Sequence, residues 1–118
     1  METIGFDVRE RVGWVALQRP ERLNSITEAV LDDLETVIDQ VERDDGIRAV
    51  ALTGAGEVFS VGLDLALLER AFEEADVFRR ILHRFHTLLL RLEGLDAPTV
   101  AAVNGTEHIW DLLPRNLR

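Results

Sequence analysis

The residues whose types and spacing best suit chemistry lie in a glycine-rich segment, residues 54–65, that follows a continuously apolar run. Gly62 lets the backbone turn tightly before a predicted helix, because glycine adopts conformations that other residues avoid. Leu63 and Asp64 would then lie at the N-terminus of that helix, where N–H groups are unpaired and carry the positive end of the helix dipole. Such an N–H can stabilise the negative oxygen that forms in acyl chemistry.

Two other interpretations of the same segment stay open. In the plainer one, Asp64 only caps the helix, which is a common role for aspartate. In the other, Gly54 and Gly56 begin the phosphate loop of a small nucleotide-binding domain. That loop lacks the third glycine of the dinucleotide fingerprint, because Phe59 stands there, and no phosphate-binding Lys follows.

Other polar residues are weaker candidates. His83 and His86 could approach one metal ion from a helix, but no third ligand is apparent and Arg84 beside them opposes a cation. Adjacent acidic residues such as Asp32 and Asp33 point apart in a helix and do not share a site. We therefore predict no metal site.

The elements that must position the glycine-rich segment follow from hydrophobic periodicity. Ser25 and Glu28 fit a capping box, which predicts Ser25 as the N-cap of the first long helix. The predicted order is strands over 4–9 and 12–18, a helix up to residue 43, a strand over 47–53, helices over 64–72 and 75–92, and a strand over 99–103. This order indicates an α/β domain with a βαβ unit.

The helix over 75–92 has a wide apolar face, which predicts that the whole face is buried. Its members are Phe78, Ile81, Leu82, Phe85, Leu88, Leu89 and Leu92. The apolar runs over 49–52 and 99–103 predict strands that are covered on both sides.

Composition limits the partners of the chain. Its 118 residues suffice for one domain, and a net charge of −9 argues against nucleic acid as a partner. The absence of Cys excludes disulfides and thiolate chemistry. The sequence contains neither a signal-peptide pattern nor an apolar run long enough to cross a membrane, so we expect a soluble cytoplasmic protein with no membrane partner.

Three segments carry motifs in a fixed order. They are residues 17–25 (LQRPERLNS), residues 47–54 with 59–65 (IRAVALTG and FSVGLDL), and residues 97–105 (APTVAAVNG). They resemble the R-P-x-x-x-N-A/S loop, the strand followed by F-[SCA]-A-G-x-D-[LI], and the P-x-I-A-A-V-x-G strand of the enoyl-CoA hydratase/isomerase (crotonase) family. The resemblance implies the N-terminal part of a crotonase-like ββα spiral over residues 1–105.

The resemblance also implies a ligand and a site. The family binds acyl-CoA thioesters and stabilises the thioester enolate with two backbone N–H groups, the first of which would come from Leu63. No cofactor is implied beyond the coenzyme A of the substrate. The implied substrate-binding residues are Arg22, Leu23, Ser60, Gly62, Leu63, Asp64 and Leu65. The family is usually trimeric or hexameric, so a homo-oligomer is implied as well.

Two departures from the family pattern bear on activity. Val61 stands where the family usually has the smaller Ala, and it could crowd the thioester. After Gly105 the family continues into a glycine-rich segment that supplies the second N–H and, in hydratases, a catalytic Glu. Here residues 106–118 form a short tail without that resemblance, and Glu107 does not align with a catalytic acid. We therefore expect a truncated crotonase-like domain.

Two hypotheses about function follow from this resemblance. In the first, the chain binds acyl-CoA as a relative of fatty-acid-metabolising lyases and isomerases, but it is inactive alone because the catalytic acids and the second N–H are missing. In the second, the chain is a non-catalytic fragment or oligomerisation module, whose open strand over 99–103 pairs with another copy or with a full-length relative.

Overall fold

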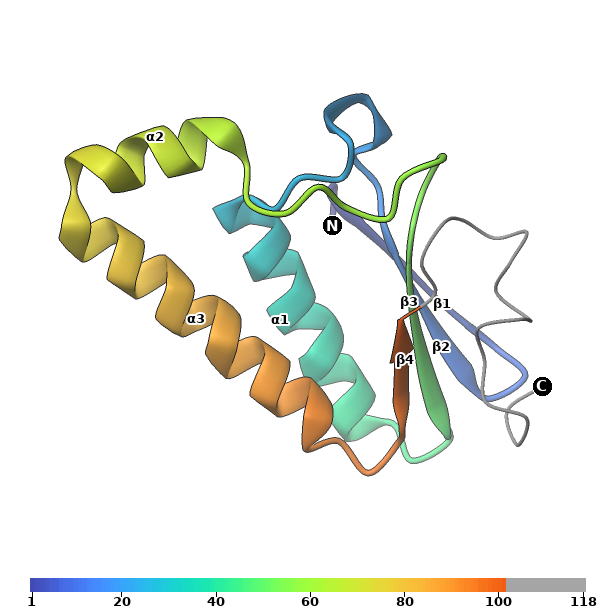
Figure 1. Cartoon of the computed structure of the whole chain (residues 1–118). Helices are drawn as coiled ribbons and strands as arrows, with labels where there is room; N and C mark the ends of the chain where they lie inside the picture. Colours follow the sequence, from blue (N-terminus) through green and yellow to red (C-terminus); the bar gives the residue numbers. More distant parts are fainter. Residues whose placement is uncertain (102–118) are drawn as a thin grey trace.

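The computed structural model describes residues 1–101, which form a four-stranded sheet with α-helices packed on one face (Figure 1). The predicted order of hairpin, helix, strand, two helices and strand is confirmed, and with it the α/β class. In chain order the elements are β1 (Ile4–Arg9), β2 (Val12–Leu17), the short 3-10 helix η1 (Pro20–Arg22), α1 (Glu28–Arg43), β3 (Ala49–Gly54), α2 (Leu65–Glu73), α3 (Ala75–Glu93) and β4 (Thr99–Ala101).

The strands follow one another across the sheet in the order β1-β2-β3-β4. β1 and β2 form the predicted antiparallel hairpin, whereas β2, β3 and β4 run parallel to one another. Parallel strands need a crossover connection. α1 provides the crossover from β2 to β3, and α2 with α3 provides the one from β3 to β4, so that α1 and α3 lie side by side (Figure 1). The C-terminal ends of β2 and β3 therefore meet at the edge of the sheet where α1 and α2 begin.

An apolar core fills the space between the sheet and α1. Ile4, Val15 and Val50 come from three different strands, and each exposes no more than 2% of its surface. Burial of such a side chain contributes about 1.5–3 kcal/mol relative to exposure. The helix α1 contributes a face of residues at helical spacing, which are Val30, Leu31, Leu34, Val37, Ile38 and Val41.

Asp33 ties the N-terminal strand to α1. Its Oδ2 accepts hydrogen bonds from the backbone N of Thr3 (3.0 Å) and from Thr3 Oγ1 (2.6 Å). Burial of the Asp33 carboxyl opposes its ionisation, but the hydrogen bonds from Thr3 outweigh that effect and lower its pKa below the ordinary value. The ionised carboxylate therefore holds the start of β1 against the helix.

The start of α1 differs from the predicted capping box. Thr27, not Ser25, is the N-cap, and its Oγ1 accepts a hydrogen bond of 3.2 Å from the N of Val30. The prediction was wrong because the Ser25 hydroxyl is engaged elsewhere, in a contact with Asp64 that lies 39 residues away in the sequence. A rule based on local sequence spacing cannot predict such a tertiary contact.

The apolar face predicted for α3 is only half buried. Ile81, Leu88 and Leu92 lie in the core as expected. Phe78, Leu82 and Leu89 are 38%, 42% and 40% exposed, because the described part of the chain covers only one side of this wide face. The prediction that the whole face is buried was therefore wrong for these three side chains.

Two arginines of α3 fix its register against α1. Arg84 and Arg91 are seven residues apart, and each forms ion pairs with two acidic residues of α1. The acidic pair that Arg91 contacts lies seven residues after the pair that Arg84 contacts, as expected for parallel helices in contact. The bridges join Arg84 Nη2 to Asp32 (2.6 Å) and Glu35 (3.6 Å), and Arg91 Nη2 to Asp39 (2.8 Å) and Glu42 (3.2 Å). These partly exposed pairs specify alignment more than they add stability, since such pairs are each worth about 0–1 kcal/mol.

The predicted strand over 99–103 is described as far as Ala101. Residues 102–105 and the tail over 106–118 lie outside the described residues, so the domain boundary at residue 105 stays a prediction. Within residues 1–101, no helix combines the length and the apolar character that a membrane crossing needs.

Candidate functional site

The site is built on a short backbone pairing between two loops. Ile26 and Leu63 form an isolated parallel bridge. The N of Ile26 donates to the carbonyl oxygen of Gly62 (2.8 Å), and the N of Asp64 donates to that of Ile26 (2.8 Å). Gly62 has a φ of +97°, a conformation that favours glycine even though a Cβ would find open space there. The turn predicted at Gly62 is confirmed.

This pairing determines the direction of the Leu63 N–H. The carbonyl of Gly62 and the N–H of Leu63 belong to one planar trans peptide, in which the two groups point in opposite directions. Because the carbonyl points at Ile26, the N–H points away from it. No residue in the part of the chain that the structure describes accepts a hydrogen bond from this N–H. The turn thus presents, just before α2, one donor that has no partner among residues 1–101.

Asp64 caps α2, as the plainer interpretation predicted. Its Oδ1 accepts a hydrogen bond of 3.1 Å from the N of Ala66, and its carbonyl oxygen accepts one from the N of Leu68. The cap leaves the N–H of Leu63 untouched. Helix capping and an available backbone donor are therefore compatible at this turn, and the two interpretations do not exclude each other.

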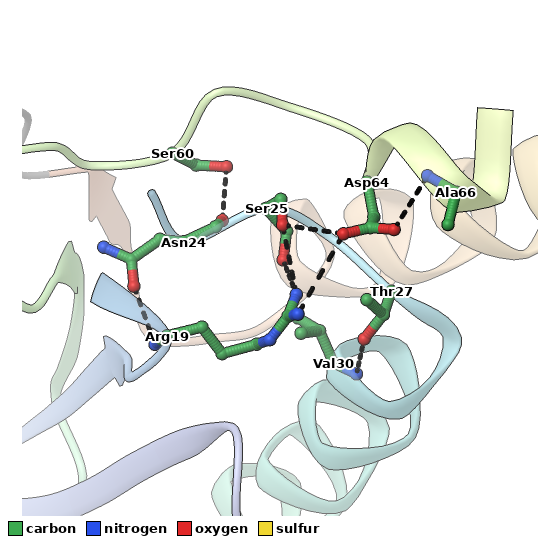
Figure 2. Close-up of polar contacts among 8 residues, drawn as sticks. All are labelled: Arg19, Asn24, Ser25, Thr27, Val30, Ser60, Asp64 and Ala66. Carbon is green, nitrogen blue, oxygen red and sulfur yellow. Dashed lines mark hydrogen bonds and ion pairs between the residues drawn. The ribbon is translucent and has the colours of Figure 1, made fainter. Parts of the chain in front are cut away.

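A polar cluster that sequence analysis missed lies behind the turn (Figure 2). Nη1 of Arg19 donates to the carbonyl oxygen (2.6 Å) and the Oγ (3.1 Å) of Ser25. Ser25 Oγ in turn donates to Asp64 Oδ2 (3.1 Å), which lies 4.0 Å from Arg19 Nη2. The Arg19 and Asp64 side chains are only 19% and 22% exposed. The clue in the sequence was the motif spacing, which placed Arg19 and Ser25 in one loop but gave Arg19 no role and Ser25 only that of a helix cap.

Asn24 joins the loop after β2 to the loop after β3. Its side chain is buried, its Oδ1 accepts from the N of Arg19 (2.8 Å), and its Nδ2 donates to the carbonyl oxygens of Ala55 (2.9 Å) and Val58 (2.7 Å). A Cβ at Gly54 would clash first with the carbonyl oxygen of Phe59 and would also come within 2.8 Å of Asn24 Nδ2, so glycine is needed there to admit both groups. Gly54 thus allows the side chain of Asn24 and the backbone of Phe59 to approach the end of β3.

The structure brings most of the predicted site residues together. Ser60 Oγ donates to the carbonyl oxygen of Asn24 (2.7 Å) and accepts from the N of Gly62 (3.1 Å), so this side chain shapes the loop. The N of Val61 donates to the carbonyl oxygen of Leu23 (3.2 Å), which places Leu23 next to the turn. Leu65, the first residue of α2, is 71% exposed.

A pocket of about 230 Å³ opens beside Leu23, between the two loops. Its lining residues are Pro20, Leu23, Asn24, Ala55, Glu57 and Val58. Arg22 precedes Leu23 at the end of η1, and its guanidinium forms no ion pair with any carboxylate among residues 1–101. Leu23 therefore lies beside both the pocket and the Gly62 turn, and Arg22 is its neighbour in the same loop.

The other polar features lie away from this turn. A pocket of about 360 Å³ at the opposite end of α1 is lined by acidic residues, among them Glu42, Asp44 and Asp96, and it would repel an anion. His83 and His86 are exposed on α3. Among residues 1–101, no group of three or more His, Asp or Glu side chains is arranged to hold a metal ion.

Comparison with known proteins assigns this fold and turn to one family. The sequence profile of the enoyl-CoA hydratase/isomerase family matches residues 7–108. The chain is 38% identical over 107 residues to 1,2-epoxyphenylacetyl-CoA isomerase of Escherichia coli, covering 89% of this chain and 41% of that protein. It is 30% identical over 112 residues to hydroxycinnamoyl-CoA hydratase-lyase of Pseudomonas fluorescens, covering 88% of this chain and 39% of that protein.

Solved structures agree with the sequence comparison. The crystal structure of the enoyl-CoA hydratase from Bacillus anthracis matches with a TM-score of 0.79 at 33% identity, covering 87% of this chain and 40% of that chain. The fold is therefore of the crotonase type. The chain belongs to the enoyl-CoA hydratase/isomerase family, and this membership replaces the nucleotide-binding interpretation of Gly54 and Gly56. It spans about two fifths of the length of the relatives it matches.

Loss of the Asn24 side chain should loosen both loops. Asn24→Ala removes three hydrogen bonds from a buried site and leaves their partners unsatisfied, so we expect the free energy of unfolding to fall by about 2–4 kcal/mol. Urea titration followed by circular dichroism measures this change. Gln40→Ala, an exposed amide on α1, is the matched control and should change it by less than about 0.5 kcal/mol. An Asn24→Ala effect as small as that of the control would contradict the role of Asn24.

Proposed function

We propose that this chain binds an acyl-CoA thioester at the Gly62 turn, where the N–H of Leu63 donates to the thioester carbonyl oxygen. One observation carries the proposal. The pairing of Ile26 with Gly62 points this N–H away from Ile26, and no group among residues 1–101 accepts a hydrogen bond from it. A donor held in a fixed direction costs little reorganisation when charge develops on the bound oxygen. Membership of the enoyl-CoA hydratase/isomerase family supports the same ligand class.

The rest of the ligand would follow the surface from the turn to Leu23. Leu23, whose carbonyl oxygen accepts from the N of Val61, and Leu65, two residues after Leu63, are exposed apolar side chains, and both suit the uncharged pantetheine arm. Arg22 offers a guanidinium to a coenzyme A phosphate. A local cation is needed because the chain as a whole carries a net charge of −9, which opposes an anionic ligand.

Leu63→Pro tests this donor, because proline has no backbone N–H. The bridge to Ile26 does not use the Leu63 N–H, so the substitution removes a donor without removing a hydrogen bond within the described protein. We expect butyryl-CoA to bind the variant about tenfold more weakly than the parent chain, in line with one hydrogen bond. Isothermal titration measures the affinity.

Leu63→Ala is the matched control, since it removes the same side chain and keeps the N–H. S-butyl-CoA, which lacks the carbonyl oxygen, should bind all three proteins equally. If Leu63→Pro and Leu63→Ala bind butyryl-CoA with the same affinity, the donor is not used. If the parent chain binds neither ligand, the proposed function fails.

We also propose that the isolated chain does not hydrate an enoyl-CoA. Hydration needs a carboxylate that positions and deprotonates water. Asp64 is the carboxylate next to Leu63, and its two oxygens are engaged by Ala66, Ser25 and Arg19. We expect the absorbance of the conjugated crotonyl-CoA thioester to decay no faster with the parent chain than with Leu63→Pro. A clearly faster decay with the parent chain would refute inactivity.

Self-association is a second candidate function, favoured by the half-exposed face of α3. Phe78, Leu82 and Leu89 form one exposed apolar stripe along this helix, and such a stripe is typical of a protein interface. We expect sedimentation velocity to show oligomers whose fraction increases with protein concentration. We expect Leu89→Glu to weaken this association. Thr87→Glu adds the same charge at an exposed position of the same helix and is the control. A chain that stays monomeric at every concentration would exclude this candidate.

A further inference from the structure

We infer that the Arg19–Ser25–Asp64 cluster is a positioning device that fixes the direction and the electrostatic environment of the Leu63 N–H. This inference rests on the proposed function, in which that N–H donates to a thioester oxygen. None of the three side chains needs to touch the ligand. They act through the backbone of Ile26 and Gly62, which determines where the N–H points.

The cluster holds the bridge from both sides. Ser25 immediately precedes Ile26, and Asp64 immediately follows Leu63, so the bond from Ser25 Oγ to Asp64 Oδ2 (3.1 Å) runs alongside the two backbone bonds of the bridge. The two loops are also linked by hydrogen bonds from Asn24, Ser60 and Val61, but those contacts all involve residues before Gly62. The bond from Ser25 to Asp64 is a side-chain link at the bridge itself, and it limits rotation of the backbone around Leu63.

Arg19 adds rigidity on the side of Ser25. Its Nη1 contacts both the carbonyl oxygen (2.6 Å) and the hydroxyl (3.1 Å) of Ser25, and its backbone N is held by Asn24 Oδ1 (2.8 Å). The planar guanidinium with several fixed donors suits such a junction better than an ammonium group. The position of Ser25, and therefore of Ile26, is set by these contacts.

Arg19 also offsets the charge of Asp64. The Asp64 carboxylate lies one residue beyond the proposed donor, where an uncompensated negative charge would oppose a developing oxyanion. Arg19 Nη2 lies 4.0 Å from Asp64 Oδ2, and both side chains are largely shielded from solvent. The carboxylate can therefore cap α2 and anchor the bridge while the guanidinium reduces its field at the N–H of Leu63. Arg19, Ser25 and Asp64 are positioning residues in this arrangement.

The first test uses the full chain without ligand. Arg19→Met keeps the length of the side chain and removes its donors and charge, and Ser25→Ala is the milder variant that removes only the hydroxyl link. We expect hydrogen exchange of the Ile26 amide, followed by NMR, to become roughly tenfold faster or more in both variants, as loss of one charge-assisted hydrogen bond would give. Arg84→Met, which removes a partly buried cation from the α1–α3 contact, is the control.

The second test measures the oxyanion itself. Acetoacetyl-CoA gives up one α-proton to water, and the remaining electron pair is delocalised onto its carbonyl oxygens, so its enolate absorbance reports stabilisation of a negative oxygen. At saturating ligand, the ratio of bound enolate to bound neutral acetoacetyl-CoA should be roughly tenfold lower for Arg19→Met than for the parent chain. Arg19→Lys should restore part of the enolate, because it returns the charge but not the fixed pair of donors.

The two tests separate this inference from the proposed function. If the parent chain does not bind acetoacetyl-CoA, the proposed function fails, and exchange of the Ile26 amide still decides whether the cluster fixes the bridge. Faster exchange in Arg19→Met and Ser25→Ala, with no such change in Arg84→Met, supports the inference. Unchanged exchange in both cluster variants, or an equal change in Arg84→Met, overturns it, as does an unchanged enolate fraction in Arg19→Met.

Discussion

The pairing of Ile26 with Leu63 is the constraint on which the rest of the site depends. It joins the loop after β2 to the loop after β3, two segments that the sheet brings to the same edge. Backbone groups buried between such loops must find partners, and the bridge together with Asn24 satisfies them. The start of α2, the turn at Gly62 and the direction of the Leu63 N–H all follow from this pairing.

Charge is distributed so that this turn differs from the rest of the molecule. The chain has a net charge of −9, and Arg84 and Arg91 of α3 are engaged with acidic residues of α1. At the turn, by contrast, the carboxylate of Asp64 is matched by Arg19. Arg22, in the loop after β2, has no acidic partner among residues 1–101. A local region with balanced or positive charge is the physical condition for an anionic ligand on an acidic protein.

Much of this arrangement could be predicted from periodicity and motif spacing. The element order and the cap at Asp64 depend on residues close in sequence, so the sequence indicated them correctly. The turn at Gly62 was also predicted, because the glycine itself marks it even though its pairing partner, Ile26, is distant in the sequence. The N-cap of α1 was misassigned because Ser25 bonds to Asp64 across 39 residues. The exposure of Phe78, Leu82 and Leu89 was also missed, because amphipathicity shows that a face is apolar without showing how much of it is covered.

The contacts that orient the Leu63 N–H all come from residues 19–68, within the two fifths of the family length that this chain spans. Orientation of the donor is therefore a local property of two loops and the end of α2. Acid–base chemistry differs, because a proton-transferring group must reach the substrate as well as be correctly placed. The E. coli isomerase and the P. fluorescens hydratase-lyase have names that describe different reactions, yet both align with this same region. On the function proposed above, one donor turn in this region would serve both reactions, and the groups that distinguish the reactions would belong to other parts of those proteins.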